Sequence, residues 1–399
     1  MKKSTNLFGK TCIALAIGAL APLGAHAAVD KEPLRIGAVS SVSGVFAQQG
    51  EEVLRGIQFA AEEANRKGGV DGRQVAVQVA DDESTPEAGR RVAEKLARDG
   101  NNLLIGAIPT SISQAISQNL ERWNALYVVV ASKGDRLTGE ACKPRMFRTN
   151  HSDAMDMAMF TEWMKGVKEK NFAVIAADYA WGRDSAEFFA KQAKSLGKSV
   201  PVSLFPPLGT KDFAPYIAQI KDAPNVDGIW VALAGRDLIA FTKQAKEFGL
   251  TSKHIIGHAA IMDFVVKATG DATKGVWGNI GYGAEIDTPA NQAFVAAWKA
   301  KYKRVPTENE GQAYNGAQAI FEGVRKAGSV KPAEVAAALR GLSYDSVYGK
   351  VSMRAEDNQL VLPSYIGQVK VVDGQPRPVI EKRYDVALVP APNGSCKLK

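Results

Sequence analysis

The sequence contains few of the side chains that most often carry out chemistry. It has four histidines and three cysteines in 399 residues, and no Cys-x-x-Cys pair. His254 and His258 are four residues apart, a spacing that suits a metal ion only on a helix. The Ile-Ile-Gly between them predicts a strand, in which residues four apart are separated by ~13 Å. We therefore expect no metal site and no cysteine redox chemistry.

Motifs of nucleotide-binding and hydrolytic enzymes are also missing. There is no GxxxxGKS/T phosphate loop and no GxSxG nucleophile elbow, and Gly281-Tyr282-Gly283 lacks the third glycine of GxGxxG. The acidic run Asp81-Asp82-Glu83 follows a predicted strand, where we interpret it as a solvated loop rather than a general acid and base. We expect no enzymatic activity and no cofactor.

A basic block with interleaved aromatic residues is absent too, although the formal net charge is +8. Lysines and glutamates instead alternate along predicted helical faces. This pattern is typical of solvated surfaces, and it argues against nucleic acid as a partner.

The first 27 residues have the layout of a secretory signal peptide. A basic segment (2–10) precedes an apolar stretch (11–23), and Ala25-His26-Ala27 supplies the small residues of a cleavage site. A retained membrane anchor is the alternative, but the stretch is shorter than the ~20 apolar residues of a membrane span. We expect cleavage after Ala27 and an exported protein.

Two cysteines, Cys142 and Cys396, follow this segment. They form either a disulfide or two free thiols. We favour the disulfide because an exposed thiol in an oxidising compartment is reactive.

The remaining 372 residues exceed the size at which one hydrophobic core stops growing, so two domains are expected. Short apolar runs alternate with amphipathic ones from residue 34 onward, beginning with a predicted strand at 34–39 and a predicted helix at 51–67. The alternation restarts after residue 149, and the chain becomes strand-rich beyond residue 342. This order predicts parallel sheets covered by helices. No flexible linker separates the halves, which favours several short crossings and a hinge.

Polar loops follow three predicted strands of the first half, at 40–50, 109–113 and 131–134. The carboxyl ends of parallel strands meet at one edge of a sheet, where α/β proteins bind small molecules. The hydroxyl-rich segment 109–113 begins a predicted helix, and its free N–H groups suit an anion. Ordinary helix capping is the alternative for each loop, but three at one edge favour a binding site.

At these loops the chain resembles the periplasmic leucine/isoleucine/valine-binding protein family, the type I solute-binding proteins of ABC importers. The resemblance covers essentially the whole mature chain and is carried by Ile36–Val39, Ser43-Gly44, Ala47–Gly50, Ile105-Gly106, Thr110–Ser113, Phe147–Thr149, Tyr179–Gly182, Lys211–Phe213, Gln244-Ala245 and Gly249-Leu250. It implies an α/β fold of two Rossmann-like lobes with parallel sheets, joined by three hinge crossings. We place lobe 1 at 28–150 with 283–349, and lobe 2 at 151–282 with 350–399.

The resemblance also implies a ligand site between the lobes. Its contacts fall on Phe46, Gln49, Thr110, Ser111, Ala131, Ser132, Lys133, Tyr179, Trp181, Ala234 and Ala259. Thr110 takes the place of the residue that grips the ligand carboxylate, and Trp181 that of an aromatic clamp. Core packing is the alternative role for Trp181. The implied partners are the permease and ATPase subunits of the importer; a sensor that signals to a receptor is the alternative function.

Two positions depart from the family pattern. Ala234 replaces an aromatic contact, and Ala259 replaces the acid that pairs with the ligand's ammonium group. A buried ammonium without a carboxylate is strongly disfavoured. Either the ligand has no α-amino group or another acid takes over, for which the candidates are Asp178, Asp237 and Asp263. With Lys133 nearby, we expect an organic carboxylate stacked on Trp181; leucine, isoleucine or valine is the alternative.

Overall fold

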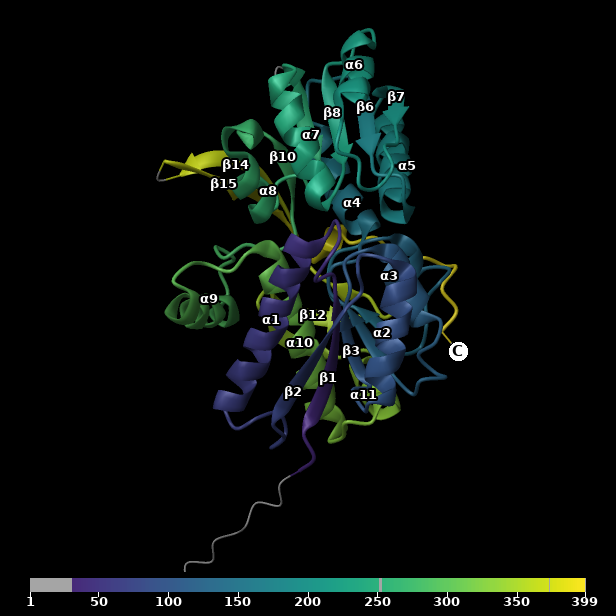
Figure 1. Ribbon diagram of the computed structural model, residues 1–399, viewed down its shortest axis with the longest axis vertical. Coiled ribbons are helices and arrows are strands. Elements are labelled where there is room, and N and C mark those ends of the chain that lie inside the picture. Colours follow the sequence, from purple (N-terminus) through teal and green to yellow (C-terminus); the bar gives the residue numbers. More distant parts are fainter. Residues whose placement is uncertain (1–30, 251–252, 373, 399) are drawn as a thin grey trace, which may run out of the picture. The chain divides into compact units, whose positions relative to one another are not determined.

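The protein is represented by a computed structural model that describes residues 31–250, 253–372 and 374–398. Two groups of elements, here called lobe 1 and lobe 2, are each built around one large sheet (Figure 1). The predicted signal peptide, 1–27, lies outside the described residues. Among the helices described, none has the length and apolarity needed to cross a membrane.

Lobe 1 contains a five-stranded sheet in which all neighbouring strands are parallel. Its order is β2 (Val75–Asp81), β1 (Leu34–Ser40), β3 (Leu103–Gly106), β4 (Leu126–Val129) and β5 (Met146–Arg148). One face packs against α1 (Ala47–Arg66), α10 (Glu308–Ala327) and α11 (Pro332–Leu339), and the other against α2 (Pro86–Arg98) and α3 (Thr110–Ser117). Strands β3 and β4 are buried throughout because helices cover both faces, which is why they read as continuous apolar runs.

A second, antiparallel sheet lies beside the helices of lobe 1 and supports a different lobe boundary from the expected one. It joins β11 (Ser343–Ser346), β12 (Gly349–Met353) and β13 (Leu360–Val361), next to α9 (Pro289–Tyr302). A boundary at 349/350 would divide this sheet, because Lys350 and Ser352 beyond the boundary pair with Asp345 and Ser343 before it. We therefore propose that the chain crosses to lobe 2 after β13.

Lobe 2 contains a seven-stranded sheet that is parallel as expected except for one strand, which runs antiparallel to both of its neighbours. Its order is β15 (Gln375–Tyr384), β14 (Ser364–Val372), β10 (Trp277–Ile280), β9 (His254–Gly257), β8 (Gly228–Ala232), β6 (Asn171–Ala176) and β7 (Ser199–Leu204). β14 runs antiparallel to β10 and to β15. Only two residues separate β14 from β15, and so short a connection allows these two strands to pair only in the antiparallel sense. The helices are α4 (Asp153–Met164), α5 (Ala180–Ser195), α6 (Ala214–Asp222), α7 (Gly235–Glu247) and α8 (Asp263–Thr269).

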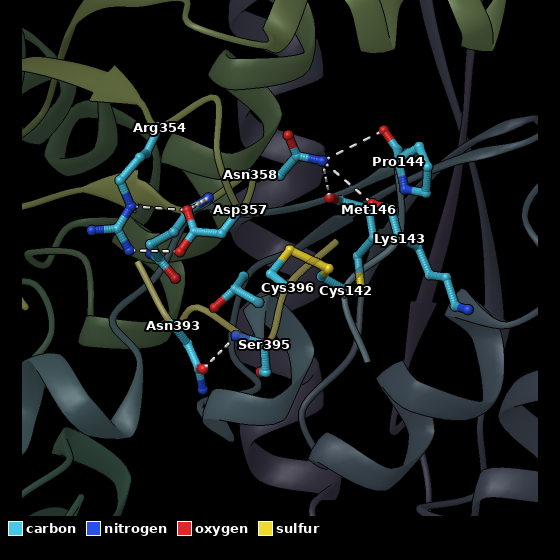
Figure 2. The surroundings of a disulfide bond; sticks show 12 residues. Cys142, Lys143, Pro144, Met146, Arg354, Asp357, Asn358, Asn393, Ser395 and Cys396 are labelled. Carbon is cyan, nitrogen blue, oxygen red and sulfur yellow. Dashed lines mark hydrogen bonds and ion pairs between the residues drawn. A yellow bond between two sulfur atoms is a disulfide. The ribbon is translucent and has the colours of Figure 1, made fainter. Parts of the chain in front are cut away.

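The C-terminal segment leaves lobe 2 after β15 and ends on lobe 1. Cys396 forms a disulfide with Cys142, which lies 254 residues earlier in the loop before β5 (Figure 2). Arg354, held by an ion pair with Asp357, donates to the carbonyl of Pro390 at 2.7 Å. The chain thus passes between the lobes once more than the three predicted crossings, and this last passage is fixed covalently.

Candidate functional site

A cavity lies between the two lobes at the carboxyl ends of their strands. It contains about 330 Å³ of empty space, part of it open to solvent. Its lining residues are Phe46, Gln49, Ile108, Thr110, Ala131, Lys133, Tyr179, Trp181, Ala234, Ala259 and Met262. Nine of these were predicted from the sequence, while Ile108 and Met262 were not. The predicted contacts Ser111 and Ser132 do not line it.

Five helices begin at this cavity, and none of them has a side-chain cap. The residues that precede α1, α3, α5, α7 and α8 are Phe46, Pro109, Tyr179, Ala234 and Met262. By contrast, side chains cap α2, α4, α9 and α10, which begin elsewhere; α6 and α11 also lack a side-chain cap. First-turn N–H groups without a cap carry partial positive charge and favour an anion.

Two glycines allow helices to start this close to the strand ends. A Cβ atom on Gly50 would lie 1.8 Å from the carbonyl oxygen of Ser41, and one on Gly182 would lie 2.0 Å from that of Ala177. No larger residue fits at either place without moving the backbone. These contacts fix the first turns of α1 and α5, which carry Gln49 and Trp181.

Thr110 presents a hydroxyl group to the cavity. Its Oγ1 accepts a hydrogen bond from the N–H of Gly134 at 3.1 Å, so its O–H hydrogen remains free to donate. Ser132 instead points behind the wall, where it donates to the carbonyls of Ala107 and Ile108 at 3.0 Å. The predicted contact role of Ser132 is therefore corrected to that of a residue that holds the loop between β3 and α3.

Aromatic rings from both lobes face the cavity. Phe46 of lobe 1 meets Tyr179 of lobe 2 edge to face, with ring centroids 6.2 Å apart, and Tyr179 lies 6.0 Å from Trp181. The indole N–H of Trp181 donates to Oδ1 of Asp153 at 2.9 Å, which fixes the ring plane. Trp181 is thus a buried side chain that also forms part of the cavity wall.

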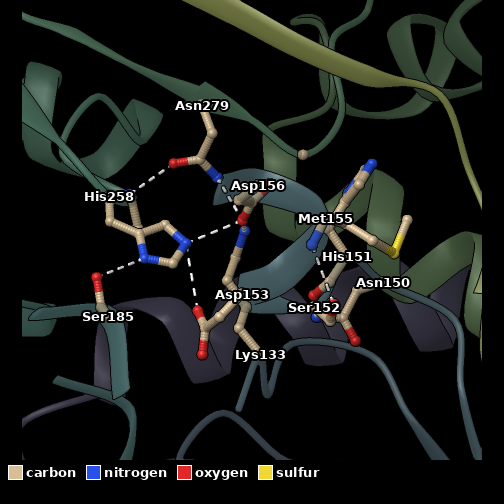
Figure 3. A network of polar contacts seen from close by, with 12 residues as sticks. Lys133, Asn150, His151, Ser152, Asp153, Met155, Asp156, Ser185, His258 and Asn279 are labelled. Carbon is tan, nitrogen blue, oxygen red and sulfur yellow. Dashed lines mark hydrogen bonds and ion pairs between the residues drawn. The ribbon is translucent and has the colours of Figure 1, made fainter. Parts of the chain in front are cut away.

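A buried polar network lies directly behind this wall (Figure 3). Oδ2 of Asp156, on α4, accepts from Lys133 Nζ at 2.6 Å, from His258 Nε2 at 2.9 Å and from Asn279 Nδ2 at 3.2 Å. Lys133 comes from lobe 1 and the other three from lobe 2. The charge of Lys133 is therefore paired, and it is not the free cation that the sequence suggested, because α4 brings Asp156 against it.

Donors and acceptors fix the protonation of His258. The Asp156 carboxylate oxygen at 2.9 Å from Nε2 only accepts, and the Ser185 hydroxyl, which accepts from the indole N–H of Trp230 at 3.2 Å, has a hydrogen left to donate to Nδ1 of His258 at 2.8 Å. The hydrogen of the neutral ring is then on Nε2, which donates to Asp156. Burial lowers the pKa of His258 and keeps it neutral.

The charge states of the other members follow from their neighbours. Burial by itself would lower the pKa of Lys133, but Asp156 and Glu308 outweigh it, and the pKa is raised. Burial by itself would raise the pKa of Asp156, but Lys133 and His258 hold it below its usual range. Burial raises the pKa of Asp153 well above its usual range, which favours the neutral acid. The network therefore contains one compensated ion pair.

The three acids considered as partners for a ligand ammonium group all interact with other groups of the protein. Asp178 pairs with Arg183 at 2.7 Å, Asp237 accepts from the N–H of Gly209, and Asp263 accepts from the N–H of Glu308. Within the described part of the chain, the residues lining the cavity include no aspartate or glutamate. This cavity suits an anion and offers an ammonium group no carboxylate.

Contacts between the lobes surround the cavity. The N–H of Arg236, at the start of α7, donates to the carbonyl of Val45 at 3.2 Å, and Gln49 Nε2 donates to Met262 Sδ at 3.3 Å. Arg136 and Asp184 form an ion pair at 3.0 Å between lobe 1 and α5. A ligand in the cavity is therefore touched by both lobes at once.

This combination of two hinged α/β lobes and an interlobe cavity defines a solute-binding protein. A family model described as "Periplasmic binding protein" matches residues 33–375. The chain belongs to this family of solute-binding transport proteins, and its predicted recognition and fold class are confirmed.

Individual relatives agree with that assignment. The chain is 27% identical over 352 residues to a leucine-, isoleucine-, valine-, threonine-, and alanine-binding protein of Pseudomonas aeruginosa, covering 88% of this chain and 92% of that one. It is similar to a solute-binding protein of an ABC transporter from Rhodopseudomonas palustris BisB5 in complex with 3,4-dihydroxy benzoic acid, with 26% identity, a TM-score of 0.81 and coverage of 89% and 98%. A second R. palustris protein, in complex with benzoate, shares the fold at 23% identity, a TM-score of 0.82 and coverage of 92% and 100%. Nothing in these comparisons supports the receptor-signalling alternative.

Proposed function

We propose that this solute-binding protein captures a small aromatic carboxylate in the periplasm and delivers it to the permease of an ABC importer. The observation that carries the proposal is that helices α1, α3 and α5 begin at the cavity with neither a side-chain cap nor an acid in the first turn, and that the described lining includes no acid. Such a site stabilises a negative charge and gives an ammonium group no compensating partner.

The aromatic character is supported by the rings of Phe46, Tyr179 and Trp181 and by the small cavity. Apolar walls with flat faces favour a planar ligand. The R. palustris relative, a solute-binding protein in complex with 3,4-dihydroxy benzoic acid, supports the same class. The P. aeruginosa relative, named for leucine and other amino acids, keeps an amino acid as the competing ligand.

Capture follows from hinge closure. The lobes exchange between an open and a closed arrangement, and a ligand that contacts both lobes favours the closed one. The closed protein then docks on the permease, whose ATPase subunits drive transport. Export by the predicted signal peptide, 1–27, places the protein where this capture occurs, and no catalysis is involved.

Titration calorimetry with benzoate and leucine tests the proposal. We expect benzoate to bind and leucine to bind at least ~100-fold more weakly, because its ammonium would be buried without a carboxylate. Thr110→Val removes the hydroxyl donor and should weaken benzoate binding ~10-fold or more, whereas Thr110→Ser should restore it. Ser111→Ala is the matched control, since Ser111 does not line the cavity. Leucine binding more tightly than benzoate would reject the proposal.

A further inference from the structure

Gln49 has one amide atom without a partner at the cavity. The side chain, in the first turn of α1, is 3% exposed and lines the cavity, and its Oε1 has no hydrogen-bond partner among the described residues. Its Nε2 donates to Met262 Sδ at 3.3 Å. Because a thioether sulfur only accepts, this contact fixes the orientation of the amide and leaves Oε1 as the unpaired atom.

Neighbouring polar groups of the cavity are already engaged. Lys133 is paired with Asp156, and the Thr110 hydroxyl, which accepts from the N–H of Gly134, makes no hydrogen bond to Gln49 Oε1. A buried carbonyl oxygen without a donor destabilises the closed state. The ligand is then the component that satisfies it.

We infer that the ligand carries a hydroxyl group that donates to Oε1 of Gln49, so that the substrate class is a hydroxylated aromatic carboxylate. This inference rests on the proposed function. A carbonyl oxygen only accepts, so its partner must be an O–H or N–H group. A neutral amide does not compensate a buried ammonium charge, and the described lining offers no carboxylate to do so. A neutral hydroxyl satisfies Gln49 without that cost.

The site should therefore bind aromatic carboxylates that carry a hydroxyl group more tightly than those that lack one. A pocket built to bond a hydroxyl group rejects an analogue that lacks it, because its own polar atom stays unpaired. The wild-type protein should bind 3- or 4-hydroxybenzoate at least ~10-fold more tightly than benzoate. In 2-hydroxybenzoate the hydroxyl donates to the adjacent carboxylate within the same molecule, so we expect no comparable gain.

Calorimetry with these four compounds, on the wild type and on Gln49→Met, tests the inference. The variant keeps the side-chain length but loses the acceptor, so the ratio of its affinities for the hydroxylated compounds and for benzoate should fall to about one, whatever its affinity for benzoate itself. Gln48→Met is the matched control, because Gln48 is exposed on the same turn. Thermal unfolding verifies that each variant is folded.

The outcomes separate the two proposals. Equal affinity of the wild type for benzoate and for both 3- and 4-hydroxybenzoate would overturn the inference while leaving the proposed function intact. So would a preference for the hydroxylated compounds that persists in Gln49→Met. No binding of any of the four carboxylates would overturn the proposed function and the inference together.

Discussion

Lys133 of lobe 1 and Asp156 of lobe 2 form an ion pair across the hinge, with 2.6 Å between Nζ and Oδ2 and side chains that are 5% and 3% exposed. The pair lies between the ligand cavity and the crossing from β5 to α4. Its members come from segments on either side of that crossing, so the pair joins the two lobes next to one of the segments that connect them.

Removing one partner of this pair should be strongly destabilising. Asp156→Ala leaves the Lys133 ammonium buried without a counter-charge, and we expect a loss of ~3–5 kcal/mol in the free energy of unfolding by urea. The double variant Lys133→Met/Asp156→Leu should lose less, because no charge remains uncompensated. A double variant no more stable than Asp156→Ala would show that the pair does not act through charge compensation.

Glu308 should make stability depend on pH in the neutral range. Burial raises its pKa to about 7, above the ordinary value of 4.5. The folded state therefore binds a proton that the unfolded state releases, and the stability contributed by the protonated group is lost as pH rises from about 4.5 through 7. Glu308→Gln should be ~1–3 kcal/mol more stable than wild type at pH 8, and the gain should shrink near pH 5.

The measurement is urea unfolding of both proteins across pH 5 to 8. Glu121→Gln serves as the control, because Glu121 is exposed. A constant difference between Glu308→Gln and wild type over this range would contradict the assignment of the proton to Glu308.

The disulfide should stabilise the protein by restraining the last passage between the lobes. Cys142→Ser/Cys396→Ser opens a covalent loop of 254 residues, and we expect a loss of ~2–5 kcal/mol in the free energy of unfolding. Reduction of the wild type should lower its stability to that of the variant. Stability unchanged by both treatments would show that the C-terminal segment is held by its non-covalent contacts alone.

Gly50→Ala should damage the site through the backbone. The added Cβ would lie 1.8 Å from the Ser41 carbonyl, so the start of α1 must shift and carry Gln49 with it. We expect weaker ligand binding and ~1–3 kcal/mol lower stability. Gly166→Ala is the control, because its Cβ would be 3.7 Å from the nearest atom, the Trp163 carbonyl oxygen. Equal effects of the two substitutions would contradict this explanation.

Much of lobe 1 and of the cavity was predictable, because short stretches of sequence indicate its strands and helices and the loops that follow the strands. The strand predicted at 34–39 is β1, and the helix predicted at 51–67 forms most of α1, which begins four residues earlier. Buried parallel strands appear in the sequence as apolar runs, and α1 buries one face of an amphipathic pattern. The cavity residues were placed by the rule that strand carboxyl ends meet at one edge, and by the family resemblance. This was sufficient for Thr110 and Trp181.

Helix α4 and the network behind the cavity were not predictable in this way. Most of the residues of α4 are buried around its circumference, so its sequence shows no amphipathic pattern. An isolated aspartate such as Asp156 is expected on the surface, but in the structure it is buried. Its partner His258 lies 102 residues further along the chain, so no local sequence pattern indicates the contact. The signal for His258 was its place directly after β9, at the same edge as the other site residues. Met262 was missed because α8 was not predicted.

The most direct test of the account is a crystal structure of the protein with 4-hydroxybenzoate. We expect the ring between the aromatic residues of the two lobes, the carboxylate hydrogen-bonded to Thr110 at the start of α3, and the hydroxyl group within hydrogen-bonding distance of Gln49 Oε1. A structure in which the carboxylate lies away from the helix starts, or in which the compound is absent while leucine occupies the cavity under matched conditions, would contradict it.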